Sequence, residues 1–491
     1  MIREEDAVSV EPVLEPGLRR RAVEILDQLE MWGQKLGLDR IRATLAGLDH
    51  PERDFPVVLV AGTNGKGSTA ALLASILSHA GYRSGLFTSP HLESVRERIR
   101  VDGRSISGPD LSNALEAVAD ASRAASEVLP TYFEAMTAAA LVHFRRRKVD
   151  CAVLEVGLGG RLDATNATEP CLGIVCSIAH DHQEHLGSTL EQIASEKLGI
   201  GRPGVPLLIW AKGQRGPQAA IRAARRRGIP VEEVWRQAHI EDADGRLRVQ
   251  TGGTPPPPSE NPPSESPPPE DRPATGDYLL NPGLLGEHQR INVALAVRAA
   301  EVLRHRLNLS HLNNEAIERG VAACRWPGRL EEFVVRVNGN KVPVLVDGAH
   351  NPAGARALRA HLDRTPSHRN SKARALLFGT VRGKRPTGTL AMLSEPVQAI
   401  WLAAPDSHRA VPGGELARRI HRHRPKLEAK LRGSNDLDEA LDEALSWCIR
   451  HRAELVVCGS LYLVGDVRRR LFERYGAPPP AADIALFGDT A

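Results

Sequence analysis

The chain has 491 residues, of which 42% are hydrophobic and 25% are charged, and its formal net charge is +4. A chain of this length exceeds one ordinary hydrophobic core, so two domains of unequal size are expected. The nearly balanced charge and an aromatic content of only 4% argue against a nucleic-acid-binding protein, which needs a basic surface or a stacking platform.

Membrane and secreted proteins are also disfavoured. No apolar run approaches the ~20 residues that a membrane-spanning helix needs, and the opening "MIREEDAVSVEP" lacks the apolar core of a signal peptide. The six cysteines fit no metal-ligand spacing, and several lie in apolar runs, which indicates free thiols in a reducing compartment. We therefore expect a cytoplasmic protein that binds neither a membrane nor nucleic acid.

Helical and strand-like segments alternate along the first part of the chain. A helical pattern over 18–32 and a shorter one over 37–48 precede an apolar strand at 57–61, a glycine loop and a helix that Gly81 ends. Strand patterns follow in the segments 83–90, 149–160, 171–179 and 206–211, and helical patterns over 108–122 and 133–148. Uniformly apolar strands between helices predict a parallel sheet covered on both faces, with its ligand beyond the carboxyl ends of the strands.

A proline-rich stretch interrupts this pattern at 252–276. Proline at such density forms neither a helix nor a central strand, and the stretch has nothing apolar to bury, so an extended, mobile surface insertion is expected. A site for a proline-binding partner is the alternative. Beyond a helix at 288–306, strand and helix patterns restart near 342 and predict a second, smaller doubly wound unit. The expected domains are 1–325, which includes the insertion, and 326–491.

The stretch "GTNGKGST" at 62–69 lies between the first strand and its helix. A glycine-rich turn there exposes backbone N–H groups at the positive end of the helix, which suits a polyphosphate. Lys66 adds a positive charge, and Ser68 and Thr69 add hydroxyls. The stretch departs from the common pattern G-x-x-x-x-G-K-[ST], because Val60 replaces its first glycine and Gly67 follows the lysine. A tight connection with an incidental lysine is the alternative.

Further motifs follow in a fixed order, and their residues are "TSPHL" at 88–92, "LEVGLGGRLDATN" at 154–166, "SIAHDHQEHLGSTLEQIASEKLGI" at 177–200, "HQRIN" at 288–292, "WPGRLE" at 326–331 and "DGAHNP" at 347–352. With these motifs the chain resembles the folylpolyglutamate synthase/dihydrofolate synthase family of the Mur-ligase group. The phosphate loop of that family reads G-T-N-G-K-G-S, as residues 62–68 do here. The resemblance extends from about 23 to 470 and is broken by the proline-rich insertion.

The resemblance implies a two-domain α/β fold, in which an ATPase domain with a parallel sheet and a phosphate loop precedes a Rossmann-like C-terminal domain. It implies an ATP-dependent ligase that joins L-glutamate to a folate, to dihydropteroate or to both, through an acyl phosphate. ATP and Mg²⁺ are the expected cofactors, with a monovalent cation as an optional addition, and a monomer is the expected state. The residues expected to bind ATP are Gly62, Thr63, Asn64, Gly65, Lys66, Gly67, Ser68, Asn292, Arg329, Asp347 and His350.

The resemblance also implies a metal site and a modified lysine. Ser89, Glu155 and His182 are expected to hold magnesium, and a carbamylated Lys197 is expected to act with Lys66 and His182 in catalysis. Glu155 ends a predicted strand just before a glycine turn, where a hard oxygen ligand is useful. The alternatives are a structural histidine, a surface lysine, and a zinc site made by the histidines of 180–185.

The second domain is expected to complete the ATP site. Arg329 can form paired hydrogen bonds with phosphate oxygens, and Asp347 follows a predicted strand where it suits a ribose hydroxyl. The resemblance places Asn292 and His350 at the adenine end; for Asp347 and His350 the alternative is a loop-capping role. The resemblance also places Asp163 and Ala164 near the folate, together with the 95–103 loop.

One departure from the family pattern lies in the second domain. The family usually carries Asp-Lys-Asp after the strand "RALLFG", whereas this chain has Gly383, Lys384 and Arg385. Both acids are absent, which puts glutamate recognition at this edge of the cleft in question.

Two other functions compete with this interpretation. A cell-wall Mur ligase generally has a third, N-terminal domain, for which a phosphate loop that begins at residue 62 leaves no room. A catalytically silent scaffold, which would bind partners through its proline-rich segment, needs none of Lys66, Glu155, His182, Arg329 and Asp347.

Overall fold

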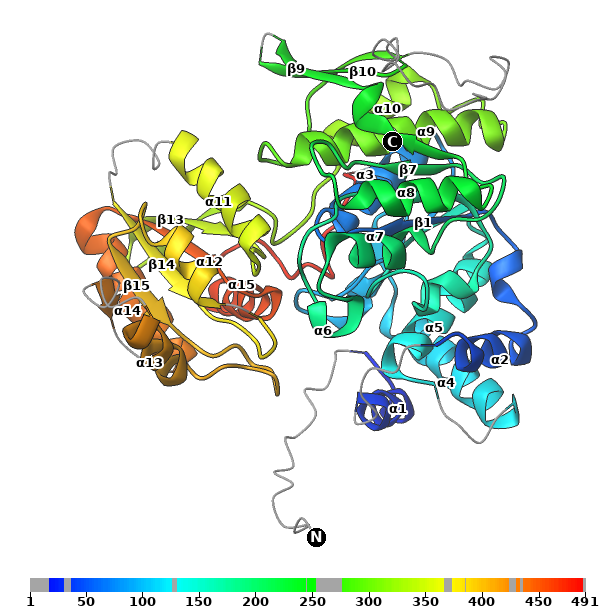
Figure 1. The fold of residues 1–491 in the computed structure, drawn as a ribbon. Coiled ribbons are helices and arrows are strands. Elements are labelled where there is room, and N and C mark those ends of the chain that lie inside the picture. The colour runs from blue at the N-terminus through cyan, green and yellow to red at the C-terminus, as the bar shows by residue number, and fades with distance from the viewer. Residues whose placement is uncertain are drawn as a thin grey trace.

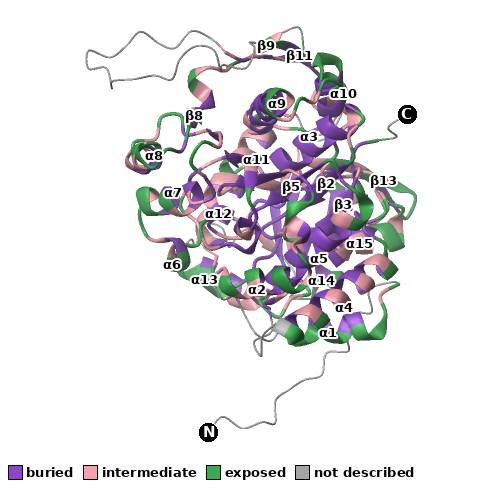
Figure 2. Cartoon of the chain, turned by 90° about the vertical axis from the view of Figure 1, so that its right-hand side faces the viewer, coloured by how far each residue is buried: buried purple, intermediate pink, exposed green. Residues whose placement is uncertain are grey.

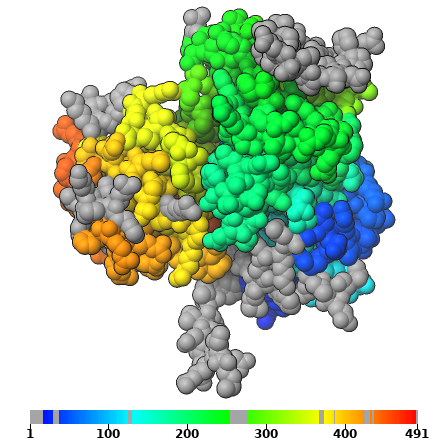
Figure 3. All heavy atoms as spheres, in the orientation of Figure 1, coloured from blue at the N-terminus to red at the C-terminus, as the bar shows by residue number. Residues whose placement is uncertain are grey.

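The structure is a computed structural model. It describes residues 17–30, 37–125, 130–243, 245–252, 276–365, 373–384, 386–423, 430–432 and 436–488. These residues form two α/β lobes that lie side by side (Figure 1), and the lobes meet across a broad boundary (Figure 3). The α/β class and the two-lobe arrangement predicted from the sequence are confirmed.

An eight-stranded sheet forms the centre of the first lobe, in the order β4-β3-β2-β5-β1-β6-β7-β8. Its strands are β1 (Val57–Ala61), β2 (Ser84–Phe87), β3 (Ile99–Val101), β4 (Arg104–Ser105), β5 (Cys151–Glu155), β6 (Pro170–Val175), β7 (Leu207–Ile209) and β8 (Val231–Glu233). All neighbours from β2 to β8 are parallel, while β3 and β4 are antiparallel at one edge. Every residue of β1 and β5 is buried, as strands covered on both faces require.

Helices cover both faces of this sheet, and the alternating side chains of β1 show how. Val57 and Leu59 belong to a core with helices α1, α2, α4, α5, α7 and α8, whereas Val58 and Val60 belong to a core with α3, α9 and α10. The helices are α1 (Arg20–Glu30), α2 (Asp39–Gly47), α3 (Lys66–His79), α4 (Gly108–Ala125), α5 (Tyr132–Arg147), α6 (Gln183–Leu186), α7 (Leu190–Leu198), α8 (Pro217–Arg226), α9 (Gln289–Arg306) and α10 (Asn314–Ala323). The sheet is buried between these helices (Figure 2), and α3 is itself covered by α9 and α10, whereas α1, α4 and α8 have exposed residues.

The second lobe contains a six-stranded sheet in the order β12-β13-β17-β14-β15-β16. Its strands are β12 (Glu331–Val337), β13 (Asn340–Val346), β14 (Arg374–Phe378), β15 (Ala399–Leu402), β16 (Leu431–Arg432) and β17 (Glu454–Cys458). Only the β12–β13 pair is antiparallel among these described strands. Helices α11 (Pro352–Arg364), α12 (Pro386–Leu393) and α13 (Gly413–His423) pack on one face, and α14 (Leu437–His451) and α15 (Leu461–Tyr475) pack on the other.

A small antiparallel sheet on the first lobe was not predicted from the sequence. It consists of β9 (His239–Ala243), β10 (Arg246–Gln250) and β11 (Asp277–Leu280). The proline-rich residues 253–275 connect β10 to β11 and lie outside the described residues, so the expected mobility stays a prediction. The ends of this connection meet, because the Thr251 amide donates to the Gly276 carbonyl at 2.9 Å.

The C-terminal tail, residues 476–488, leaves α15 and returns to the first lobe. Leu486 and Phe487 are 0% exposed and belong to the same core as α3 and α9. Figure 1 shows this red segment crossing from α15 toward the first lobe. The domain limits 1–325 and 326–491 stay a prediction, and the tail is a part of the second range that packs on the first lobe.

The cysteines are unpaired, and the helices are those of a protein without a recognisable membrane span in its described part. All six cysteines are free thiols, and five of them are buried. Over the described part of the chain, no helix is both long enough and apolar enough to cross a membrane.

Candidate active site

The phosphate loop, residues 62–68, joins β1 to α3 as predicted. Gly65 caps α3 with a φ of 87°, a left-handed conformation that favours glycine. A Cβ atom at this position would also lie 2.4 Å from Oδ1 of Asn292. Glycine therefore lets the loop turn tightly at the amino end of α3, where the N–H groups of a first helical turn have no partner within the helix and can bind phosphate.

Polar contacts hold the loop against the chain that follows β6. The amide of Thr63 donates to the carbonyl of Ser177 at 2.9 Å, and the Thr63 hydroxyl donates to the carbonyl of Ala179 at 3.1 Å. The amide of Asn64 donates to the Ser177 hydroxyl at 2.9 Å. Because these contacts fix the loop on the sheet, its shape is set before a ligand arrives.

Asn292 supports the loop from behind. Its Nδ2 atom donates to Gln289 at 2.7 Å, and its Oδ1 atom accepts from the hydroxyl of Thr69 at 3.3 Å. Gln289 also donates to the hydroxyl of Ser68, at 3.4 Å. Asn292 is 4% exposed. Its contact with adenine stays a prediction, and in this structure its side chain is engaged with α3 and its own helix.

Glu155 lies at the carboxyl end of β5, directly beside the phosphate loop. Its Oε2 atom accepts from the Ser89 amide at 3.0 Å, and a Cβ atom on Gly67 would lie 3.3 Å from the same oxygen. Burial raises the pKa of Glu155, whereas Lys66, the Ser89 amide and Arg329 oppose that rise. A buried carboxylate that favours nearby positive charge, with the Ser89 hydroxyl on the adjacent loop, has the donor chemistry that Mg²⁺ prefers.

His182 begins the short helix α6 and faces the second lobe. Burial and the ammonium of Lys384 lower its pKa to about 4, and its Nε2 atom lies 3.3 Å from Nζ of Lys384. The imidazole is therefore neutral at pH 7, which is the form that ligates a metal. The alternative zinc site is not supported, because no group of three or more His, Cys, Asp or Glu side chains is placed to hold a metal among the described residues.

Lys197 lies on α7 and points into the first lobe rather than into solvent. It is 3% exposed, and its Nζ atom donates to the carbonyl of Gly62 at 3.1 Å. Burial, with a smaller contribution from Lys66, lowers its pKa to about 7. The surface-lysine alternative is wrong for this residue. A partly neutral amine can react with carbon dioxide, which supports the predicted carbamate, and the modification itself stays a prediction.

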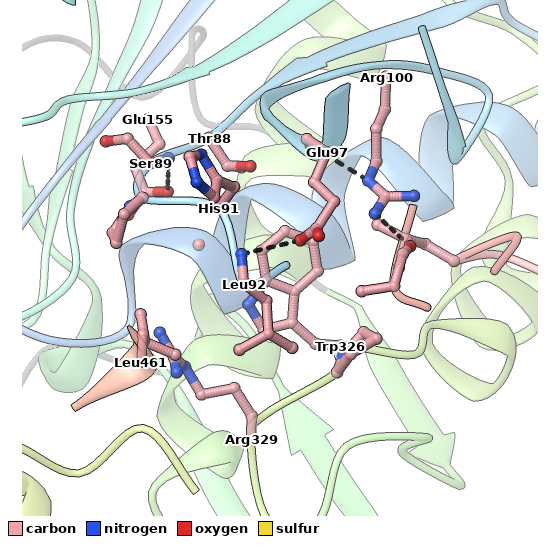
Figure 4. Close-up of a pocket in the computed structure, with 15 residues that line it drawn as sticks. Thr88, Ser89, His91, Leu92, Glu97, Arg100, Glu155, Trp326, Arg329 and Leu461 are labelled. Carbon is pink, nitrogen blue, oxygen red and sulfur yellow. Dashed lines mark hydrogen bonds between the residues drawn. The ribbon is translucent and has the colours of Figure 1, made fainter. Parts of the chain in front are cut away.

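Arg329 of the linker and Asp347 of the second lobe, both expected to complete the ATP site, differ in where their side chains lie. Arg329 points toward the cavity beside Ser89 and Glu155 (Figure 4). Asp347, in contrast, accepts from the amides of Leu330 and Ala349, both at 2.9 Å, and is 7% exposed. These bonds match the loop-capping alternative for Asp347, while its ribose contact stays a prediction.

A polar cluster between the lobes was missed by the sequence reasoning. We call it the Asp181 junction, and it consists of Asn64, Asp181, Asn351 and Lys384. Asn351 donates to Asn64 at 2.9 Å and to Asp181 at 3.3 Å. Lys384 donates to Asp181 at 3.0 Å, and the charge of its ammonium lowers the pKa of Asp181 to about 2 against the effect of burial. Asp181 lies in "AHDH" and Asn351 in "DGAHNP", so the motifs held a signal for both.

His350 lies next to this junction. Its Nδ1 atom contacts the Gly348 carbonyl at 2.8 Å, and its Nε2 atom lies 3.9 Å from Asp181. Burial and Lys384 lower the pKa of His350 to about 4. Its predicted adenine contact is not tested by these distances. Lys384 is the positively charged residue of the Asp181 junction. The two acids of the family's Asp-Lys-Asp pattern are replaced by Gly383 and Arg385 in this chain, and Arg385 lies outside the described residues.

Asp163 is engaged within its own loop. Its Oδ1 atom accepts from the amide and the hydroxyl of Thr165 at 3.1 and 2.6 Å, and its Oδ2 atom accepts from the amide of Leu158 at 2.9 Å. Asp163 is 4% exposed and Ala164 is 5% exposed. Their predicted folate contacts stay a prediction that this geometry does not favour.

A cavity lined by Ser89 and Glu155 lies where the two lobes meet (Figure 4), and His182, the third residue predicted to hold the metal, is not among the residues that line it. The first lobe contributes Gly67, Glu155 and the loop that carries Ser89, while the linker contributes Trp326 and Arg329. The C-terminal tail contributes Ala481 and Leu486. A phosphate loop, a buried carboxylate beside it and a second lobe that closes over both are the features of an ATP-dependent ligase of the Mur type.

Comparisons with known proteins agree with that class. The model of the Mur ligase middle domain matches residues 60–206, and the model described as "Dihydrofolate synthetase, C-terminal domain" matches residues 331–470. The dihydrofolate synthase/folylpolyglutamate synthase of Bacillus subtilis is 33% identical over 448 residues, which cover 90% of this chain and 96% of the relative. The folylpolyglutamate synthase of Lacticaseibacillus casei is 30% identical, with 88% of this chain and 94% of the relative covered.

Solved structures show the same relationship. Escherichia coli FolC in complex with DHPP and ADP has a TM-score of 0.75 and 28% identity, covering 92% of this chain and 98% of that chain. A bifunctional folylpolyglutamate synthase/dihydrofolate synthase with Mn, AMPPNP and L-glutamate bound has a TM-score of 0.73, 28% identity and the same coverage. The chain belongs to the dihydrofolate synthase/folylpolyglutamate synthase family. It is an ATP-dependent acid–amino-acid ligase, and the predicted use of ATP with a divalent metal is confirmed.

Proposed function

We propose that this chain joins L-glutamate to the carboxylate of a folate or of dihydropteroate, using ATP and Mg²⁺ and releasing ADP and phosphate. The observation that carries the proposal is the position of Glu155, which lies beside the phosphate loop and shares a cavity with Arg329 from the linker. This arrangement concentrates fixed charge where a phosphoryl group would be transferred.

The first half of the reaction forms an acyl phosphate. An oxygen of the acceptor carboxylate attacks the γ-phosphorus of ATP, and the bond to the β-phosphate oxygen breaks, so that ADP leaves. Lys66 and the first turn of α3 hold the phosphates, and Arg329 neutralises charge from the linker side. Ser89, Glu155 and His182 would hold the magnesium ion, which supplies further charge neutralisation when bound.

The second half forms the amide. The amine of L-glutamate attacks the acyl carbon, phosphate leaves, and the amine loses a proton. Water would hydrolyse the acyl phosphate, so the two lobes must stay closed during this step. The Asp181 junction supports closure, because Asn351 and Lys384 of the second lobe bond directly to Asn64 and Asp181 of the first.

A direct assay tests the proposal. Purified chain is incubated with ATP, Mg²⁺ and L-glutamate, with dihydropteroate in one series and tetrahydrofolate in a parallel series. We expect ADP release that requires both glutamate and an acceptor, with mass spectrometry showing a product one glutamate heavier. Activity in one series alone would define a monofunctional enzyme, and no acceptor-dependent ADP in either series would overturn the proposal.

We also propose that the enzyme is a monomer that acts in the cytoplasm. All six cysteines are free thiols, which supports a reducing compartment. Light scattering of the purified chain should give a mass near 53.3 kDa, and a mass near a multiple of that value would overturn the monomer.

A further inference from the structure

The C-terminal tail is docked between the lobes and lines the cavity with Ala481 and Leu486, although the two reaction steps above give it no chemical role. The Phe487 ring covers Gly103, where an added Cβ atom would lie only 2.8 Å from the ring. The carbonyl of Leu486 accepts from the amide of Arg325 at 2.7 Å, so the tail pairs with the linker that carries Arg329. The lobes are therefore joined by two adjacent segments of chain rather than by the linker alone.

Arg100 forms a buried binding site for the tail. Arg100 is 2% exposed, and its guanidinium donates to the carbonyls of Ala481 at 2.7 Å and Ile484 at 3.2 Å. The same group donates to the carbonyls of Glu97 at 3.3 Å and Gly103 at 3.2 Å. Figure 4 shows Arg100 extending toward Glu97 at one edge of the cavity. One cation thus holds the tail against the segment that carries Glu97.

A second buried contact holds the loop 88–98 from the other side. Oε2 of Glu93 accepts from the amide of Ala481 at 2.9 Å, and its Oε1 atom bonds to Arg468 of α15. Arg468 is 2% exposed and is also bonded to Glu331, at 2.9 Å. The loop's Leu92 lies in the core of the second lobe, where an added Cβ on Gly465 would come 1.9 Å from the Leu92 carbonyl.

The loop 88–98 transmits these contacts toward the metal residues. Glu97 accepts from the amides of Leu92 at 2.9 Å and Glu93 at 2.8 Å, which makes this part of the loop one hydrogen-bonded unit. Ser89 lies in the same loop, and its amide donates to Glu155 at 3.0 Å. A shift of the loop at Glu93 would therefore move Ser89 relative to Glu155.

We propose that the C-terminal tail is a positioning element for the ligase reaction: docked between the lobes, it fixes the loop 88–98 and so holds Ser89 against Glu155. The catalytic part of this inference rests on the proposed function. No residue of the tail needs to touch a substrate. The tail acts through Arg100, Glu93 and the linker, and a small displacement of a catalytic loop is enough to slow a reaction strongly.

Leu486→Asp in the full-length chain tests this coupling, because a charge at a fully buried site releases the tail. Amide hydrogen exchange is measured without substrates. We expect faster exchange along 481–487 and, in the same variant, at Ser89 and Leu92, by at least about tenfold. Faster exchange in the tail with unchanged exchange at Ser89 and Leu92 would overturn the proposal, and this outcome does not depend on whether the proposed reaction is right.

Glu93→Gln is a milder variant that serves if the first does not fold. It keeps the size of the side chain but removes the charge that Arg468 faces. We expect kcat to fall on the order of 10-fold, with the KM for ATP within about twofold of wild type, because the phosphate loop is not touched. Asp442→Asn is the matched control, since Asp442 bonds the exposed Arg474 on the second lobe. Equal kcat values for Glu93→Gln and Asp442→Asn would refute a positioning role.

Discussion

Two of the contacts that hold the second lobe against the first differ in composition. The Asp181 junction is polar, and the side chains of Asp181 and Lys384 keep 14% and 12% of their surface exposed. The docked tail buries Leu486 and Phe487 completely, and the nearby loop places Leu92 in the core of the second lobe. Water can replace a polar contact at little cost, whereas it cannot replace buried apolar contacts. The difference suits a molecule that opens at the junction and stays attached at the tail.

The largest effect on stability is expected at the tail. Phe487→Ala removes a fully buried ring that packs against Gly103 and should lower the free energy of unfolding by about 3–5 kcal/mol. Chemical denaturation monitored by circular dichroism measures the change. A loss below about 1 kcal/mol, as is typical of exposed sites, would show that the tail is only loosely bound.

A substitution in the phosphate loop should lower the activity strongly and leave the stability of the fold nearly unchanged. Lys66→Ala should reduce glutamate-dependent ADP formation on the order of 100- to 1000-fold, because a charge facing the transferred phosphoryl group is lost. The fold should persist, since Lys66 is half-buried and the hydrogen bond that its Nζ atom donates to the carbonyl of Thr63 is long at 3.5 Å. Steady-state kinetics and thermal unfolding are measured on the same preparation. Turnover at the wild-type rate would remove this loop from the mechanism.

The junction should show a smaller effect. Lys384→Gln removes the ammonium that bonds the largely buried Asp181 and should cost about 1–3 kcal/mol in the free energy of unfolding. If the junction supports closure, kcat should still fall, by roughly tenfold. Arg359→Gln is a suitable control, because Arg359 pairs with Asp363 on the outer part of the same lobe. A stability loss as large as that of Phe487→Ala would erase the contrast between the two attachments.

Acid should weaken the tail side of the interface. Burial, with a smaller effect of Arg98, lowers the pKa of His91 to about 3, and its ring accepts from Arg98 at 2.9 Å. Between pH 6.5 and pH 3 the unfolded chain binds a proton at this residue and the folded chain does not, so stability falls as the pH falls, by at most about 1.4 kcal/mol per pH unit for one group. Thermal unfolding at pH 7, 6 and 5 should show this loss, and His91→Asn, which does not titrate, should reduce it. Equal slopes for the variant and wild type would contradict this assignment.

The smallest effect on stability and activity is expected at the proline-rich segment, which belongs neither to the Asp181 junction nor to the docked C-terminal tail. Replacing residues 253–275 with a short Asn-Gly turn should change the free energy of unfolding by about 1 kcal/mol or less, because Thr251 and Gly276 already meet. Activity should equal that of wild type. A large loss of either would show that the proline-rich segment contributes to the fold or to the reaction.

The sequence predicted the first strand, the phosphate loop and α3 well, because their signals are local: a buried apolar run, glycines at a turn and a helical pattern. It also predicted residues that the structure brings to one cavity, namely Ser89, Glu155 and Arg329. The support that Asn292 gives to the phosphate loop was not predicted, since it depends on Thr69, 223 residues away.

The tail and the small antiparallel sheet were missed for a similar reason. The segment "ADIALFGD" is too short to show a helical or strand period, and only its contacts with Arg100 and Gly103 show where it belongs. Asp163 shows the converse case, a residue that the sequence singled out but whose role the sequence could not define. Asp163 lies in a family motif, which led to the prediction that it binds folate. In the structure it is hydrogen-bonded to Leu158 and Thr165 and so supports its own loop, and the sequence does not distinguish this structural role from ligand binding.

The return of the tail has a practical consequence for measuring lobe motion. Because Leu486 and Phe487 are buried in the first lobe, a fluorophore attached near the end of the chain would be carried by the first lobe, although most of the last 160 residues form the second. A distance experiment with labels at such a site and on α3 would report almost no change during closure. A label on the exposed face of α13 or α14 would follow the second lobe instead.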